Sequence, residues 1–157
     1  MEKKPWEELE DSRFGMLAVG RDPAGHFIPM TAFAEPESGK IWFYTNRDSH
    51  LAQATESGAP GVFIVMAKNQ EVQACMRGEL RATCDALHLD KYWSAAVSAW
   101  FPKGKDDPSL TMMCLTRAEA DVWVSDAGVL RFGWETAKAN LTRSTPDVGG
   151  HAHLEFP

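Results

Sequence analysis

Several signatures are missing from this sequence, and each absence removes a class of protein. The three cysteines form no C-x-x-C pair and leave an odd count, which disfavours a disulfide-stapled domain and favours buried thiols in a reducing compartment. No apolar run approaches the roughly 20 residues that a membrane span needs. The N-terminal segment MEKKPWEELED lacks the apolar region of a signal peptide. We therefore expect a cytoplasmic protein.

Common catalytic and nucleic-acid-binding signatures are missing as well. The chain contains no G-x-G-x-x-G, Walker A, H-E-x-x-H or G-x-S-x-G motif, so four common chemistries lack their signatures. The net charge is -6, and no basic stripe offsets it, which argues against a nucleic-acid partner. His151 and His153 could chelate a metal, but two ligands near a chain end are weak support, and we predict no metal site.

Aromatic residues are abundant. The 157 residues include six Trp and eight Phe, which suggests the aromatic walls of a core or of a pocket for a flat ligand. Apolar residues make up 44% of the chain, as is usual for one globular domain with a sizeable core. We expect that single domain over residues 1–143, followed by a loosely ordered tail over 144–157, where Pro, Gly and His accumulate.

The hydrophobic pattern predicts a chain built largely of short strands. Apolar segments between turn residues predict strands over 14–19, 26–33, 41–44, 61–67, 72–83, 110–115, 120–124 and 129–132. Capping residues and helical spacing predict helices near Pro5 and over 48–57, 85–100 and 134–141. Pro29 implies an edge strand or a bulge, and Gly78 implies a bulge. The residues alone favour an antiparallel barrel or sandwich with helices at its ends.

The segment 40–53 carries the strongest functional signal. Four consecutive apolar residues at 41–44 predict a strand buried on both faces. Thr45 and Asn46 follow, just before a helix for which Asp48 is the expected N-cap. Polar side chains at a helix N-terminus lie near free N–H groups that favour phosphate. The residues alone leave two interpretations open, a phosphate-binding turn and a capped helix without a ligand.

The same segment carries a family resemblance. The run Phe43-Tyr44-Thr45-Asn46, with Ser49 three residues on, resembles the F-Y-T-N-x-x-S segment of pyridoxamine phosphate oxidases. Three further pieces resemble the general-stress-protein branch of the same FMN-binding split-barrel superfamily. They are R-D-S-H at 47–50, W-F-P-x-G-K-D-D-P at 100–108 and A-K-A at 137–139. Together these pieces cover nearly the whole chain, from about residue 6 to 142.

The resemblance implies a mainly β fold, a six-stranded antiparallel Greek-key split β-barrel with several peripheral helices. It also implies a homodimer that holds FMN, or alternatively FAD, in a groove between its subunits. Residues matching the family's cofactor contacts are Thr45, Asn46, Ser49 and His50 at the phosphate end, the backbone of Met30 and Thr31 along the ring, Gln73 near its polar edge, and Trp123 and Arg131 from the second subunit.

Two positions depart from the family pattern. Ile28 and Leu51 stand where the family has a phosphate-binding Arg and Lys. A hydrogen bond to a charged partner contributes roughly 1.5–3 kcal/mol, so the loss of two costs about 3–6 kcal/mol. That loss corresponds to on the order of 10²- to 10⁴-fold in affinity. Arg47, His50 and the N-terminus of the helix could offset part of it.

Two main functional hypotheses follow. The first is an FMN-binding, stress-related flavin-dependent oxidoreductase, with unknown catalytic residues. True pyridoxamine phosphate oxidase activity is disfavoured, because the segment after Trp123 lacks the R-L-H-D-R run with which those oxidases hold the substrate phosphate. The second is a flavin-poor or flavin-free binding or sensor module that retains the dimeric barrel. A weaker third option is another planar ligand such as haem.

Overall fold

The computed structural model describes residues 7, 9, 11–20, 26–124 and 150–156, and most of them lie in strands. The strands are β1 (Phe14–Val19), β2 (Ile28–Thr31), β3 (Phe33–Glu35), β4 (Lys40–Asn46), β5 (Ala59–Met66), β6 (Val72–Ala82), β7 (Leu110–Val124) and β8 (Gly150–Glu155). The helices are α2 (His50–Ala54), α3 (Ala86–Tyr92) and α4 (Ala95–Ser98), with one 3₁₀ turn, η1 (Gly104–Asp106).

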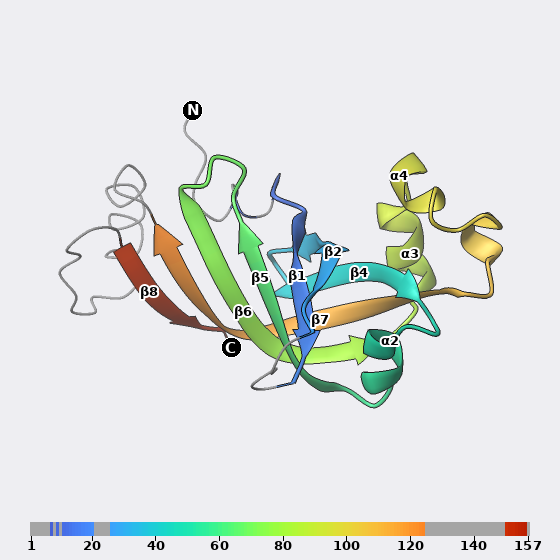
Figure 1. Cartoon of the computed structure of the whole chain (residues 1–157), viewed down its shortest axis with the longest axis horizontal. Coiled ribbons are helices and arrows are strands. Elements are labelled where there is room, and N and C mark those ends of the chain that lie inside the picture. The colour runs from blue at the N-terminus through green and yellow to red at the C-terminus, as the bar shows by residue number, and fades with distance from the viewer. Residues whose placement is uncertain (1–6, 8, 10, 21–25, 125–149, 157) are drawn as a thin grey trace.

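One antiparallel sheet contains all of these strands, in the order β2-β1-β5-β6-β7-β4-β3, and β8 pairs with β7. Strands β2 and β3 lie at the two ends of this order, yet only Ala32 separates them in the chain. The sheet must therefore curl until its two edges approach each other (Figure 1). This architecture confirms the predicted split-barrel class, with eight strands in the described part of the chain instead of the six that the resemblance implies. The additional strands arise because the expected strand 26–33 is divided at Ala32 and because β8 is added.

Two local predictions about the sheet are confirmed. Pro29 lies in β2, the terminal strand of the sheet, where its missing N–H removes no essential hydrogen bond. The register of β6 against β7 shifts between Arg77 and Gly78, which is the expected bulge. Gly78 is required there, because a Cβ at this position would overlap the carbonyl oxygen of Thr116.

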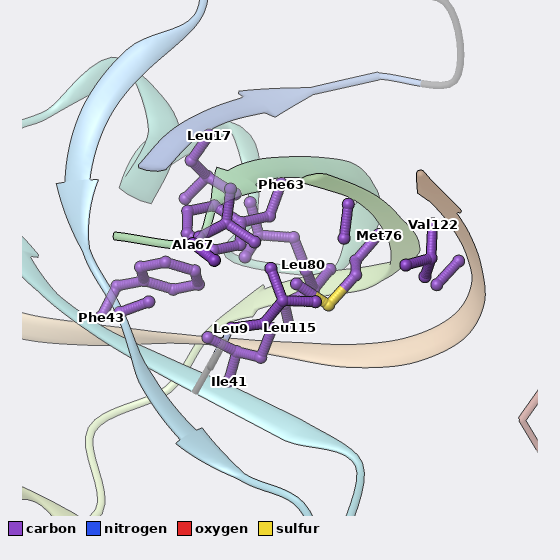
Figure 2. Close-up of a cluster of buried hydrophobic side chains, with 14 of the residues drawn as sticks. Leu9, Leu17, Ile41, Phe43, Phe63, Ala67, Met76, Leu80, Leu115 and Val122 are labelled. Atoms are coloured by element: carbon purple, nitrogen blue, oxygen red, sulfur yellow. The ribbon is translucent and has the colours of Figure 1, made fainter. Parts of the chain in front are cut away.

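Two apolar clusters stabilise the fold. The main core fills the barrel and includes Leu17, Phe43, Phe63, Leu80 and Leu115 (Figure 2). The second cluster includes Phe33, Trp42, Leu89, Val97, Phe101, Leu110 and Met112. Because successive residues of a strand point to opposite faces, β4 contributes Phe43 to the first cluster and Trp42 to the second. The prediction of a strand buried on both faces is therefore confirmed.

The expected helix over 85–100 is divided into two short helices. Trp93 ends α3 with extended backbone angles (φ -62°, ψ 132°), and the side chain of Ser94 then caps α4 by accepting a hydrogen bond from the N–H of Val97. Phe101 is buried at the end of this segment, whereas Trp100 is 82% exposed.

One further expectation changes near the C-terminus, and one changes for the cysteines. Residues 150–155, which were expected to belong to a loosely ordered tail, form the strand β8. Its backbone pairs with β7, and Ala152 and Leu154 pack against the main core. The strand predicted over 129–132 and the helix predicted over 134–141 lie outside the described residues. Among the cysteines, Cys114 is buried and Cys75 is half-buried, but Cys84 is exposed, contrary to the expectation of buried thiols.

Candidate functional site

Two of the four residues in the F-Y-T-N run have structural roles. Phe43 is fully buried in the main core. The hydroxyl group of Tyr44 donates a hydrogen bond to the carbonyl oxygen of Leu89 at 2.6 Å, which ties β4 to α3. Burial raises the pKa of Tyr44 to about 12, so this hydroxyl stays protonated and keeps its role as a donor. Only Thr45 and Asn46 of this run remain available to a ligand.

The turn between β4 and α2 is held by hydrogen bonds between close neighbours in the sequence. The side chain of Asn46 accepts a hydrogen bond from the N–H of Asp48 at 2.8 Å, and the carbonyl oxygen of Asn46 accepts one from the N–H of Ser49 at 3.0 Å. Ser49 is the N-cap of α2, because its Oγ accepts from the N–H of Ala52 at 3.1 Å. The prediction of Asp48 as the N-cap is therefore wrong by one residue.

A pair of hydroxyl groups lies at the centre of this turn. The Oγ1 atom of Thr45 and the Oγ atom of Ser49 are 3.2 Å apart, and both residues are half-buried. Each hydroxyl carries one proton that it can donate. The two hydroxyls share one hydrogen bond, so one of their two protons lies between them and the other is left for a ligand. A phosphate oxygen next to this pair could accept both protons in place of the bond that joins the hydroxyls.

The positive charge near these hydroxyls differs from the family's pattern. Leu51, at the position of the family's Lys, is 2% exposed and belongs to the main core, while Ile28 is 37% exposed. The nearest guanidinium along the chain is that of Arg47, whose Nη2 atom donates to the carbonyl oxygen of Leu110 at 3.1 Å. A guanidinium has five N–H donors, so Arg47 retains others for an anion. His50 is exposed at the start of α2.

The remaining predicted contacts lie on a different surface, which we call the sheet face. It is the outward side of β1, β5, β6 and the end of β7, and its exposed apolar residues are Phe14, Met16, Ile64, Met66 and Trp123. Gln73 lies on this face directly between Met66 and Trp123, its partners on the adjacent strands. Thr31 lies opposite Phe14. The side chain of Met30 instead packs against the main core.

The turn and the sheet-face residues are far apart within one chain. Thr45 pairs with Thr111 near the start of β7, and Trp123 lies near the end of this 15-residue strand. At about 3.3 Å per residue, the path along β7 is roughly 40 Å. Figure 1 shows α3 and α4 at one end of the sheet and β8 at the other. The structure therefore brings together two separate groups of predicted residues, and Arg131 lies outside the described part of the chain.

An open hollow of about 610 Å³ adjoins the sheet face at the bulge between β6 and β7, and its lining includes Pro60, Val62, Arg77, Gly78 and Glu119. Its volume is within the range of small-molecule pockets. None of the predicted cofactor-binding residues lines this hollow. It is therefore distinct from the Thr45–Ser49 turn.

One cluster of charged residues was not predicted from the sequence. The carboxylate of Asp121 binds the guanidinium of Arg77 at 2.7 Å and the ring nitrogens of His153 and His151 at 2.9 Å and 3.3 Å. The hydrogen bond from Arg77, with those from the histidines, lowers the pKa of Asp121 to about 2. The alternation of His151 and His153 with apolar neighbours could have predicted β8, the strand that carries these two histidines. Across the described ranges, no group of three or more His, Cys, Asp or Glu side chains could hold a metal ion.

Comparisons with known proteins identify similar sequences and folds. The family model described as "Pyridoxamine 5'-phosphate oxidase like" matches residues 1–147. A crystal structure assigned as a general stress protein 26 from Jannaschia sp. CCS1 is 35% identical, with a TM-score of 0.74, over 96% of this chain and 95% of that one. The general stress FMN/FAD binding protein from Xanthomonas citri is 33% identical, with a TM-score of 0.68, over 76% of this chain and 84% of that one.

One comparison found no relative, and the helices were also checked for membrane spans. No curated protein matches the sequence. In the part of the chain that the structure describes, none of the helices combines the length and the apolar character needed to cross a membrane.

Proposed function

Because this chain belongs to the pyridoxamine 5'-phosphate oxidase-like family, we propose that it binds FMN, or alternatively FAD, between two copies of the chain. We propose a stress-related flavin-dependent oxidoreductase, distinct from a true pyridoxamine phosphate oxidase. The free cysteines fit a cytoplasmic location. The observation that carries the proposal is the pair of Thr45 and Ser49 hydroxyls, 3.2 Å apart before α2.

In this proposal the turn holds the phosphate end of the flavin. Thr45 and Ser49 donate their hydroxyl protons to phosphate oxygens, and Asn46 keeps the turn in shape through its bond to Asp48. Arg47 supplies the fixed positive charge, and the exposed His50 at the start of α2 can add a ring N–H donor. When bound, the flavin supplies the redox chemistry, and the chain contributes binding and orientation.

The homodimer is supported by the composition of the sheet face. Phe14 is 74% exposed, Met66 50% and Ile64 41%, and neighbouring exposed apolar side chains are typical of protein interfaces. A second copy covering this face would remove these side chains from water. It would also allow Trp123 and Gln73 of one copy to approach the ring of a flavin whose phosphate is held by the other copy's turn.

The direct test is a spectrum and a titration. We expect the purified protein to take up FMN and to change the fluorescence of added FMN in a saturable way. Since two charged contacts of the family are replaced by Ile28 and Leu51, we expect binding roughly 10²- to 10⁴-fold weaker than in a site that keeps both cations. FMN fluorescence that stays unchanged up to high micromolar protein would contradict the proposal.

A second candidate function is favoured by one observation. Leu51 stands where the family has a phosphate-binding Lys, and its side chain is buried in the main core. This position therefore offers no cation to a phosphate group. A flavin-free binding or sensor module that keeps the dimeric barrel would have this property. The same titration separates the two candidates, because only the flavoprotein shows saturable binding. The oligomeric state, measured by light scattering, should be dimeric for both.

A further inference from the structure

Strand β8 is held by backbone pairing with β7 and by side-chain contacts on both of its faces. Its backbone pairs with β7 from Val124 opposite Gly150 to Glu119 opposite Glu155. Inward-pointing Ala152 and Leu154 pack against the main core. Beyond the strand, the Phe156 ring lies 4.9 Å from the guanidinium carbon of buried Arg117. These apolar contacts do not depend on pH, so any pH dependence of the attachment must come from the outward face of β8.

On the outward face, one carboxylate links three strands. Asp121 of β7 binds Arg77 of β6 through Oδ2 and both β8 histidines through Oδ1. The Nε2 atom of His153 also lies 3.7 Å from a carboxylate oxygen of Glu119. Because both nitrogens of His153 face carboxylates, both can donate only when the imidazole is doubly protonated.

The other groups on this face favour the same protonation state. Glu119 and Glu155 lie directly opposite each other on β7 and β8, which is unfavourable when both are charged. A protonated His153 offsets this repulsion. On the β6 side, Cys75 lies opposite Asp121, and burial raises the pKa of its thiol, so it adds no charge near neutral pH. Arg77 is the other cation in the cluster.

The cluster is joined to a residue of the candidate site. The ring of His151 stacks on the indole ring of Trp123, with centroids 5.0 Å apart and an interplanar angle of 18°. His151 lies opposite Trp123 in the register of the two strands, so the stack forms only when β8 is paired at this end. The attachment of β8 therefore fixes one face of Trp123.

We propose that β8 is a proton-sensitive latch, in which protonated His153 binds Asp121 and Glu119 and so holds the stack of His151 on Trp123 in place. The latch is tightest in mildly acidic solution and loosens as the pH rises. It acts within a single chain and does not require that flavin binds, so it goes beyond the proposed function. If Trp123 does contact a flavin ring, the latch makes the position of that contact depend on pH.

The direction of the pH effect follows from the geometry. The hydrogen bond to Asp121 raises the pKa of His153 above its ordinary value of 6.5, so its contribution is fully present below that value. The contribution is lost as the pH rises through the raised pKa. The pKa of Asp121 is lowered, so its contribution is present above 3.8 and is lost only as the pH falls through about 2. The latch is therefore fully closed between pH 3.8 and pH 6.5.

Hydrogen exchange of the β8 amide groups tests the latch. We expect protection factors, corrected for intrinsic exchange, to be about two- to fivefold higher at about pH 6 than at about pH 8.5. His153→Gln should abolish this ratio, while His26→Gln, an exposed histidine outside the cluster, should leave it unchanged. A wild-type ratio of one, or a full ratio in His153→Gln, would overturn the latch.

A second readout follows Trp123 itself. In protein labelled with 5-fluorotryptophan, the resonance assigned by Trp123→Phe should move over the same pH interval without any flavin present. His153→Gln should remove most of that movement. A Trp123 resonance that is constant with pH would contradict the coupling between the latch and the candidate site. Because no flavin is added, a failure of flavin binding leaves both measurements interpretable.

Discussion

The turn from Thr45 to Ser49 and the surface around Trp123 are both candidate contacts of one ligand, but they are built differently. Apart from the bonds that tie Arg47 to Ser109 and Leu110, the hydrogen bonds of the turn join residues no more than four apart, such as Asn46 to Asp48 and Thr45 to Ser49. The Trp123 surface depends on strand register, because Gln73, Trp123 and His151 are neighbours only through the pairing of β6, β7 and β8.

This difference determines what can damage each region. A local turn survives changes elsewhere as long as its own side chains remain. A surface built by register is lost when one strand slips, since a shift of one residue turns every side chain to the opposite face. The bulge at Gly78 sets that register for β6. A substitution in one region should therefore leave the other region intact.

Gly78→Ala should have the largest effect. The new Cβ would overlap the carbonyl oxygen of Thr116, so the strands must move apart or the bulge must shift, which we expect to reduce the free energy of unfolding by about 3 kcal/mol. Gly39→Ala is the control, because nothing lies within 4 Å of its Cβ and only its φ of 70° is strained. That strain costs about 1–2 kcal/mol. Urea unfolding measures both, and a Gly39→Ala loss as large as that of Gly78→Ala would contradict this account of the bulge.

Asp121→Asn should have an intermediate effect, limited to the register-built region. It removes the anion that Arg77, His151 and His153 share, and we expect a loss of about 1–2 kcal/mol at pH near 6. The loss should shrink as the pH rises through the raised pKa of His153. Urea unfolding at several pH values measures it. Asp90→Asn, which breaks the exposed pair with Lys105, should cost about 0.5 kcal/mol or less, and an equal loss in both variants would contradict the central role of Asp121.

Ser49→Ala should have the smallest effect on stability and a selective effect on binding. It removes the N-cap of α2, which costs about 1 kcal/mol. Ser94→Ala removes the N-cap of α4 and is the matched control for that loss. Flavin binding should weaken about tenfold in Ser49→Ala and stay unchanged in Ser94→Ala and Ser38→Ala. Equal binding by all three variants, measured by FMN titration, would remove the assigned phosphate site.

The sequence predicted the local features well. The apolar run before Thr45, the proline at a terminal strand and the glycine at the bulge each have one physical cause that operates within a few residues. The N-cap was missed by one position because the side chain of Asn46 engages the N–H of Asp48. The helix over 85–100 was predicted as continuous because its apolar spacing hides the break at Trp93, where Ser94 starts a new helix.

The features that depend on pairing could not be predicted in the same way. Nothing near Asp121 in the sequence indicates that Arg77 and His153 lie beside it, because these contacts span 44 and 32 residues. The strand β8 had a signal, since His151, His153 and Glu155 alternate with apolar residues. The surrounding Pro and Gly outweighed that signal. The single-chain separation of Thr45 from Trp123 also required the register of β7.

The most direct test of the account is whether one flavin uses the turn of one subunit and the Trp123 surface of the other. The double variant Thr45→Val/Ser49→Ala and the variant Trp123→Ala should each bind FMN poorly. After subunit exchange in an equal mixture, half of the dimers are mixed, and each mixed dimer has one site with both defects and one with neither. We predict that tight FMN binding returns to about one quarter of all sites. A mixture that binds no better than its two parents would contradict a site shared between subunits.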